Sequence, residues 1–235
     1  MVDIHSHLIF DIDDGSKSLD QSIKYLNEIK KIGLKRVICT PHSKSGNIDK
    51  IVKTNENYKK LLKEAKKRYI KLYLGNEILY SDKTIRLLER NRLKTLNDSE
   101  YILIEFKRTE RMDIDHIIDI LENLKENGYK VILAHPELYV NYRDIEYMCR
   151  IKDTGTLLQM DATSILRNKT SKKIYKFSKK LLERNLIDIV ASDAHCTKKR
   201  SYLNFKKAYK RIKRKYGKIY ADTLFSENPA LLIGG

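Results

Sequence analysis

The sequence predicts an α/β fold in which parallel strands form a sheet or a barrel, and three observations support this. Short β-branched or leucine-rich runs alternate with longer amphipathic stretches along nearly the whole chain. Gly33 and Gly128 stand just beyond two of the amphipathic stretches, as glycine often does after a helix. No linker, low-complexity segment or internal repeat divides the 235 residues, so we expect one domain over residues 1–235.

Seven strands are expected, and each is a short apolar run. The first follows Met1 directly and the last precedes the Ser192-Asp193-Ala194-His195 run. The predicted strands cover residues 2–4, 37–39, 72–74, 102–104, 131–133, 157–160 and 187–190. The amphipathic stretches between them predict helices, most clearly over residues 19–32 and 114–126.

The charge of the chain is strongly positive, with 48 Lys and Arg against 31 Asp and Glu and a net charge of +17. Such an excess of positive charge is typical of proteins whose partners carry phosphate. The densest block, residues 198–218, also carries a helical apolar stripe at Tyr202, Phe205, Tyr209, Ile212 and Tyr216. We therefore interpret the block as a packed amphipathic helix and expect no specific nucleic-acid partner. An anionic phosphoprotein, cell-surface polyanion or membrane surface remains an alternative.

The cysteines and the hydropathy of the chain indicate in which cell compartment the protein acts. Cys39, Cys149 and Cys196 show no CxxC spacing, which fits a reducing environment. The chain has no apolar run of membrane-spanning length and no charged-then-apolar leader, so we expect a cytoplasmic protein without a transmembrane segment.

The cysteines also exclude one class of phosphatase. A cysteine nucleophile needs an arginine six positions later, around a loop that binds the phosphate. The residues six beyond the three cysteines are Ser45, Gly155 and Tyr202. The sequence also lacks the GxGxxG, Walker A and GxSxG patterns of nucleotide-binding and acyl-transfer sites.

Ligand-type side chains follow nearly every predicted strand. Five of the six histidines lie at strand ends or in the next turn, among carboxylates. In a barrel of parallel strands these positions converge at the carboxyl-terminal rim. The nine candidates are His5, His7, Asp14, His42, Glu77, Glu105, His135, Asp193 and His195. This set is too large for one tetrahedral ion and predicts two or three metals with bridging carboxylates.

Some members of this set have simpler interpretations. Glu77 and Glu105 follow apolar strands, where an ordinary salt bridge is the alternative to a metal. Asp14 precedes Gly15, and an Asp-Gly pair is common in turns. Asp3 is expected at most to orient a ligand histidine.

A multinuclear site of this kind activates water and stabilises a phosphoryl group during in-line displacement. Arginine binds phosphate oxygens through two parallel hydrogen bonds, and Arg200, five residues past His195, is the best-placed candidate. Its alternative role is as one more member of a basic helix. Lys44, Lys107 and Arg108 follow predicted strands and also reach the rim.

With these residues assembled, the chain resembles the PHP (polymerase and histidinol phosphatase) superfamily, and within it the manganese-dependent protein-tyrosine phosphatases of capsular and exopolysaccharide loci in Gram-positive bacteria, the CpsB type. The resemblance covers essentially the full length. It rests on Asp3-Ile4-His5-Ser6-His7, Asp13-Asp14-Gly15, Pro41-His42, Glu77, Thr95-Leu96-Asn97-Asp98-Ser99, Leu103-Ile104-Glu105-Phe106, Ala134-His135, Ser192-Asp193-Ala194-His195 and Asn228-Pro229.

This resemblance implies a distorted TIM-like (β/α)7 barrel of the PHP type with a centre of two or three metal ions, usually Mn²⁺, with Fe or Zn as alternatives. It implies catalytic roles for Arg200, Asp14 and His42. One ion would be held by His5, His7, Glu77 and Asp193, a second by Glu77, His42, Glu105 and His135, and a third by Asp14 and His195 with shared ligands.

The implied substrate is the phosphotyrosine tail of a bacterial tyrosine kinase that controls polysaccharide export, which would bring the protein near the membrane. In one place the chain departs from the family pattern: Leu138 stands where a catalytic arginine is expected. Losing such a contact costs about 10²–10³ in rate. Arg143, Lys107 and Arg108 are the candidates to compensate, with Arg143 and Arg200 as the predicted phosphate-binding pair.

Two other functions fit the same residues. One is a PHP phosphoesterase acting on a small metabolite such as histidinol phosphate, or on nucleic-acid ends. The other is a metal-bearing regulatory binding protein with little turnover, which Leu138 favours and the full set of ligand-type residues disfavours.

Overall fold

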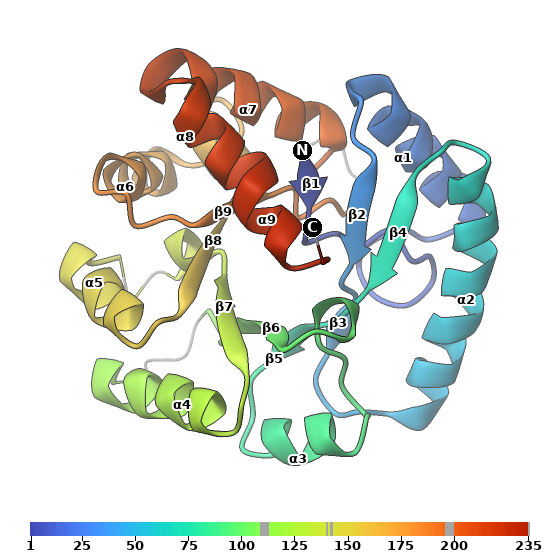
Figure 1. Ribbon diagram of the computed structural model, residues 1–235, viewed down its shortest axis with the longest axis horizontal. Coiled ribbons are helices and arrows are strands. Elements are labelled where there is room, and N and C mark those ends of the chain that lie inside the picture. The colour runs from blue at the N-terminus through green and yellow to red at the C-terminus, as the bar shows by residue number, and fades with distance from the viewer. Residues whose placement is uncertain (109–112, 140, 142, 196–199, 235) are drawn as a thin grey trace.

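The computed structural model describes residues 1–108, 113–139, 141, 143–195 and 200–234, and it has an α/β architecture with parallel strands surrounded by helices (Figure 1). All pairings between the named strands are parallel. One sheet has the order β1 (Val2–Asp3), β2 (Arg36–Cys39) and β4 (Lys71–Leu74). The other has the order β3 (His42–Ser43), β5 (Glu77–Leu79), β6 (Tyr101–Glu105), β7 (Lys130–Ala134), β8 (Leu157–Asp161) and β9 (Ile189–Ala191).

Backbone hydrogen bonds connect the two sheets at their ends. The chain passes from β2 to β3 through Thr40 and Pro41, and Glu77 N donates to Pro41 O at 3.3 Å. Beyond β1, Ser6 forms a parallel bridge with Ala194, which follows β9. The strands form two separate sheets, so the structure shows an α/β fold with parallel sheets.

Helices form where the sequence supplies an amphipathic face and a cap. Ser18, Asn47 and Asp113 accept hydrogen bonds from first-turn N–H groups of their helices. Gly33 ends the first helix in the left-handed conformation, with φ of 77°. The helices are α1 (Leu19–Ile32), α2 (Ile48–Lys66), α3 (Thr84–Glu89), α4 (Ile114–Glu126), α5 (Ile145–Asp153), α6 (Lys172–Glu183), α7 (Tyr202–Tyr216), α8 (Lys218–Asp222) and α9 (Asn228–Leu231).

The seven predicted strands are present, with ends shifted by one or two residues. The first ends at Asp3 rather than at residue 4, and the last begins at Ile189 rather than at residue 187. The prediction missed β3 and β5, which begin at His42 and Glu77. These two side chains therefore lie at the start of short strands rather than in loops after strands. The predicted helices over residues 19–32 and 114–126 are confirmed.

The basic block near the carboxyl terminus is a packed helix. In α7 the side chains of Tyr202, Phe205 and Ile212 are fully buried, whereas the charged residues face outward. Phe205 stacks on Phe225 with ring centroids 5.1 Å apart. The amphipathic interpretation is confirmed for the helix. Lys198, where the predicted block begins, and Cys196 lie outside the described residues.

Replacing Phe205 by alanine should destabilise the protein by about 3–5 kcal/mol, because a fully buried ring leaves a cavity. Urea unfolding followed by circular dichroism measures this change. Lys207→Ala, an exposed change on the same helix, should stay within about 0.5 kcal/mol. Equal stability of both variants would contradict the packing described for α7.

The structure also bears on the expectations about a membrane span and about the cysteines. Within the described residues, no helix combines the length and the apolar character needed to cross a bilayer. Cys39 is buried and Cys149 is half-buried, and neither forms a disulfide with another described residue.

Candidate metal centre

The strands and the loops beside them bring all nine ligand-type residues to one place. His5 and His7 follow β1, Glu105 ends β6, and His135 follows β7. Asp193 and His195 follow β9, close to the amino-terminal pair because Asp193 N donates to His5 O at 3.0 Å. The members that lie within a few ångströms of one another form three groups: His5, His7 and Asp193; His42, Glu77 and Glu105; and His7, Asp14, His42 and His195.

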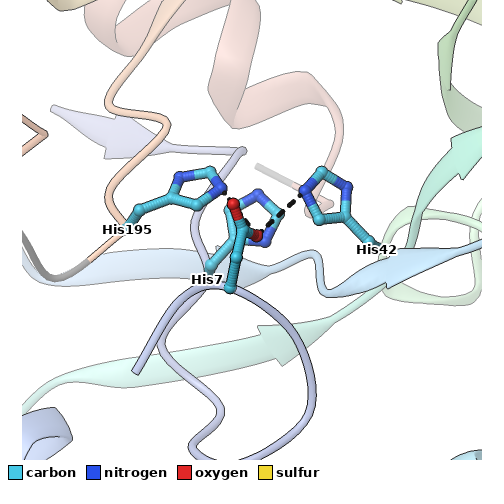
Figure 2. Close-up of side chains that lie close together, drawn as sticks. His7, His42 and His195 are labelled. Carbon is cyan, nitrogen blue, oxygen red and sulfur yellow. Dashed lines mark ion pairs between the residues drawn. The ribbon is translucent and has the colours of Figure 1, made fainter. Parts of the chain in front are cut away.

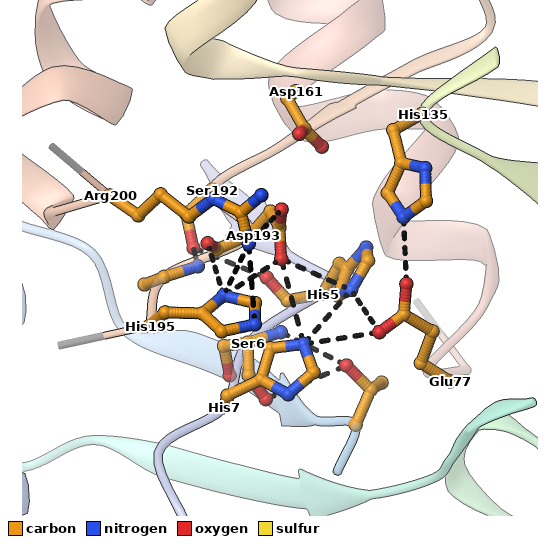
Figure 3. A network of polar contacts seen from close by, with 12 residues as sticks. His5, Ser6, His7, Glu77, His135, Asp161, Ser192, Asp193, His195 and Arg200 are labelled. Carbon is orange, nitrogen blue, oxygen red and sulfur yellow. Dashed lines mark hydrogen bonds and ion pairs between the residues drawn. The ribbon is translucent and has the colours of Figure 1, made fainter. Parts of the chain in front are cut away.

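The most buried part of the centre contains two histidines facing two carboxylates (Figure 3). The Nε2 atoms of His5 and His7 lie 3.2 Å apart. Each is 3.3 Å from Glu77 Oε2 and 3.5 Å from Asp193 Oδ1. Two ring nitrogens and two carboxylate oxygens thus converge on one point, which is the donor set of a borderline divalent metal.

Glu77 extends the centre to a second group. Its Oε2 atom is 2.7 Å from His42 Nδ1, while its Oε1 atom is 2.8 Å from His135 Nε2. Glu105 completes this group, with one oxygen 3.4 Å from His42 Nδ1 and the other 3.7 Å from His135 Nε2. Because its two oxygens face different histidines, Glu77 has the placement of a bridging carboxylate.

A third group lies at the open side of the centre. His7, His42 and His195 surround a common point in Figure 2, with the rings of His7 and His195 3.9 Å apart. The Oδ1 atom of Asp14 lies 3.3 Å from the Nε2 atoms of both His42 and His195. The side chain of Asp14 is 68% exposed, whereas that of His195 is 5% exposed. Asp14 therefore closes the centre on its solvent side.

Buried oxygens without hydrogen bonds show that these residues fit metal ions. Glu77 Oε2 and both carboxylate oxygens of Asp193 are buried and accept no hydrogen bond from the described residues. They nevertheless lie within ion-pair distance of several ring nitrogens. Buried carboxylate oxygens that accept no hydrogen bond are costly, and cations placed between them and the imidazoles remove that cost. The arrangement therefore fits divalent metal ions.

The close packing of histidines and carboxylates shifts the pKa values of His5, His42 and Glu77. Burial lowers the pKa of His5, but the carboxylates of Glu77 and Asp193 outweigh burial and raise it to about 10. Burial likewise opposes the charged form of His42, and the carboxylates of Glu105 and Glu77 raise its pKa to about 11. Burial raises the pKa of Glu77, yet the surrounding histidines hold it well below its usual range. Glu77 therefore stays ionised, and metal ions would replace the protons on the imidazoles.

Two side chains that the sequence analysis missed hold the histidines in place. Asp13 Oδ2 lies 2.8 Å from His7 Nδ1 and accepts a hydrogen bond from His42 N at 3.0 Å. Gln159 Oε1 lies 2.8 Å from His5 Nδ1. Such partners fix the orientation of ligand rings. One signal was available for Gln159, since it is the only polar residue between Leu157 and Met160 of an apolar strand.

Close packing explains a glycine in the first loop. A side chain at Gly15 would place its Cβ 2.4 Å from His7 Cβ. The main partner of Asp3 is not a histidine ring: its carboxylate accepts hydrogen bonds from Ser192 N at 2.8 Å and Ser192 Oγ at 2.6 Å. Asp3 therefore holds the turn before Asp193.

Arginines border the centre on the β7–β9 side. Arg200 Nη1 lies 3.1 Å from Asp193 Oδ2 and 3.0 Å from His195 Nδ1 (Figure 3). Arg108 Nη2 lies 3.2 Å from His135 Nε2. Arg143 donates to the carbonyl oxygen of Glu137 at 3.1 Å. A cleft of about 390 Å³ is lined by Arg108, Leu138, Arg143, Asp161 and Arg200, among other residues.

Comparison with known proteins places this architecture in a family. A family described as "Capsular polysaccharide synthesis, CpsB/CapC" matches residues 1–234. The chain belongs to the CpsB/CapC family. Among its relatives, the tyrosine-protein phosphatase CpsB of Streptococcus pneumoniae is 34% identical over 99% of this chain and 98% of its own length. The tyrosine-protein phosphatase YwqE of Bacillus subtilis is 30% identical over 99% of this chain and 91% of its own length.

Solved structures agree with this CpsB/CapC assignment. A structure described as YwqE from Bacillus subtilis and CpsB from Streptococcus pneumoniae, "unique metal-dependent tyrosine phosphatases", matches with a TM-score of 0.87 and 28% identity over 99% of this chain and 94% of that one. The organophosphorus hydrolase of Deinococcus radiodurans matches with a TM-score of 0.64 and 12% identity over 99% of this chain and 92% of that one, which shows the fold alone.

Proposed function

We propose that this chain is a metal-dependent protein-tyrosine phosphatase. Its family membership supports the proposal, as do full-length relatives named tyrosine-protein phosphatases. The observation that carries it is the convergence of eight imidazole and carboxylate side chains, joined by His135 through Glu77, beside a cleft lined by arginines. A phosphate monoester entering the cleft would meet both the centre and the guanidinium groups.

We propose Mn²⁺ as the resident metal, in two or three sites. His5, His7, Glu77 and Asp193 would hold one ion, Glu77, His42, Glu105 and His135 a second, and Asp14, His195 and shared ligands a third. A cluster held there supplies positive charge to the phosphoryl oxygens and an activated water. Nitrogen and oxygen donors also accept Fe and Zn, so metal supply decides part of the occupancy.

Around such a centre the residues of the chain have separate roles. Arg200 would bind the phosphoryl oxygens, because a guanidinium donates two parallel hydrogen bonds to them. Arg143 and Arg108 line the same cleft and are placed to share that charge. At the solvent side Asp14 would orient the attacking water and take up its proton, and His42, 3.3 Å away, would hold the Asp14 carboxylate in position.

We further propose that the two sheets belong to one distorted (β/α)7 barrel and that residues 1–235 form a single domain. Support comes from the bridge between Ser6 and Ala194 and from the continuation of β2 into β3. The substrate we propose is the phosphotyrosine tail of a bacterial tyrosine kinase that regulates capsular or exopolysaccharide synthesis. The protein would then act in the cytoplasm, close to the membrane that holds the kinase.

A thiol-free variant tests this chemistry. The protein with Cys39, Cys149 and Cys196 all replaced by alanine should keep its kcat/KM on a phosphotyrosyl peptide within about threefold, once circular dichroism shows that it folds. Chelation should abolish turnover in both proteins, and Mn²⁺ should restore it. Activity that survives thorough chelation but is lost on alkylation would overturn the proposal.

The same assay separates the alternatives. Histidinol phosphate and a 5′-phosphorylated oligonucleotide serve as competing substrates at equal concentration. A higher kcat/KM for either one would indicate a PHP phosphoesterase of another specificity. Leu138 favours one further candidate, a metal-bearing binding protein, and this is indicated if the metal-loaded protein binds a phosphotyrosyl peptide without hydrolysing it.

A further inference from the structure

A second hollow lies beside His42 and the start of α2. It is at the β3 end of the six-stranded sheet, whereas the arginine cleft is at the β7–β9 end. Its volume is about 120 Å³, enough for several water molecules and therefore for a carboxylate or phosphoryl group. Four cationic side chains line it, and its lining contains no Asp or Glu. The cations are Lys44, Lys50, Arg92 and Lys94.

Among the described residues, no carboxylate pairs with these four cations. Elsewhere on the surface, lysines pair with acids, as Lys152 does with Asp188 and Lys130 with Glu100. Within the described part of the chain, the side chains of Lys44, Arg92 and Lys94 form no ion pair or hydrogen bond. Like charges brought together without counterions produce a local positive potential that attracts an anion.

The hollow is joined to the metal centre. Lys50 Nζ donates to the carbonyl oxygen of His42 at 2.8 Å, and the His42 ring meets both Glu77 and Asp14. His42 is thus a wall of the hollow and a member of two ligand groups. Asn47, the N-cap of the 19-residue helix α2, also lines the hollow, so the positive end of the helix dipole adds to the potential.

A longer groove continues from this hollow. A neighbouring hollow of about 410 Å³ shares Asn55, Leu74 and Lys94 with it and adds the walls Tyr58 and Tyr73. Amide side chains offer both donors and acceptors, which match the peptide groups of an extended chain. The walls formed by Tyr58, Tyr73 and Leu74 suit the apolar side chains of such a peptide. This combination favours a peptide over a polyphosphate or nucleic acid, whose backbone presents acceptors to a protein.

We propose that the basic hollow beside His42 is a subsite for an anionic side chain of the substrate peptide, near the target phosphotyrosine. A glutamate or aspartate carboxylate and a second phosphoryl group have the required chemistry. This inference rests on the proposed phosphatase function. It gives part of the large positive charge a purpose, which is to select phosphotyrosines in acidic surroundings.

Three phosphotyrosyl peptides test the subsite: one with neutral flanks, one with flanking glutamates, and one with a neighbouring phosphoserine. Kinetics on each, and binding of versions with non-hydrolysable phosphonomethyl-phenylalanine by fluorescence anisotropy, give KM and Kd. The variant is Lys44→Gln/Arg92→Gln/Lys94→Gln. Its matched control, Lys207→Gln/Lys210→Gln/Arg214→Gln, removes the same charge from exposed positions on α7.

The wild type should bind both anionic peptides more tightly than the neutral one. The hollow variant should weaken that binding about tenfold, flatten its dependence on salt, and change para-nitrophenyl phosphate hydrolysis less than about twofold. The control should resemble the wild type. Lys44→Glu, a single exposed change, should show the same preference loss if the triple variant folds poorly.

Several results would overturn the subsite. One is an equal loss of affinity for neutral and anionic peptides in the hollow variant. The others are an unchanged affinity for the anionic peptides, or a loss that affects only the binding of oligonucleotides or anionic vesicles. The relative strength of the glutamate and phosphoserine peptides identifies the preferred anion. Hydrolysis of all peptides without preference by the wild type would overturn only the subsite, whereas hydrolysis of none would overturn the proposed function itself.

Discussion

Glu77→Gln should lower kcat/KM on a phosphotyrosyl peptide by at least about 10³-fold, equivalent to several kcal/mol of metal-derived stabilisation. The reason is position: the carboxylate of Glu77 lies within 3.3 Å of ring nitrogens from His5, His7, His42 and His135. A neutral amide there removes the negative charge that two groups share. Fewer metal equivalents should be retained, as plasma emission spectrometry of the purified protein would measure.

Thermal unfolding gives a second readout for Glu77. Metal at about 100 times its Kd stabilises the wild type by about 2.7 kcal/mol, which raises Tm by about 5–10 °C for a chain of this size. Glu77→Gln should lose most of that metal-dependent shift. Glu100→Gln, which removes an exposed carboxylate paired with Lys130, is the matched control and should keep it. Full metal content and activity in Glu77→Gln would refute the bridging role.

Arg200→Ala should lower kcat/KM by about 10²–10³-fold, mainly through kcat, since a contact to the transferring phosphoryl group is strongest in the transition state. Arg200 already contacts Asp193 and His195, so its guanidinium lies at the edge of the centre. Steady-state kinetics on one peptide measures the effect. Arg214→Ala, an exposed arginine on α7, should leave the kinetics unchanged. If Arg200→Ala lowers only the metal content of the protein, the role of Arg200 would be to hold Asp193 in place rather than to bind phosphate.

Leu138→Arg should raise kcat/KM by up to about 10², which is what one added phosphate contact supplies. Leu138 lines the cleft beside Arg108, Arg143 and Arg200, so an arginine there has access to the same ligand. The same peptide assay applies, with folding checked by circular dichroism. An unchanged rate in a folded variant would mean that Arg108 or Arg143 already fills the role, and Arg108→Ala and Arg143→Ala would then show which one does.

The sequence predicted that the ligand-type residues gather at one edge, because parallel strands end there, and His5, Glu105 and His135 needed only the strand order to be placed together. It could not predict that His42 and Glu77 begin strands, since two- and three-residue strands carry too short a pattern. Gln159 and Asp13 depend on contacts across the fold, and Arg108 on a side-chain direction, which local sequence does not encode.

Residues from the two ends of the chain complete the metal centre together. Ser192 contacts Asp3 across 189 positions of the chain, and Asp193 joins His5 and His7 in the same cluster. While the protein is still being translated, the early histidines have emerged without the carboxylate that completes their site. Contacts of such long range also slow folding. The nascent chain is therefore expected to acquire its full metal affinity only after β9 has been made and has docked beside β1.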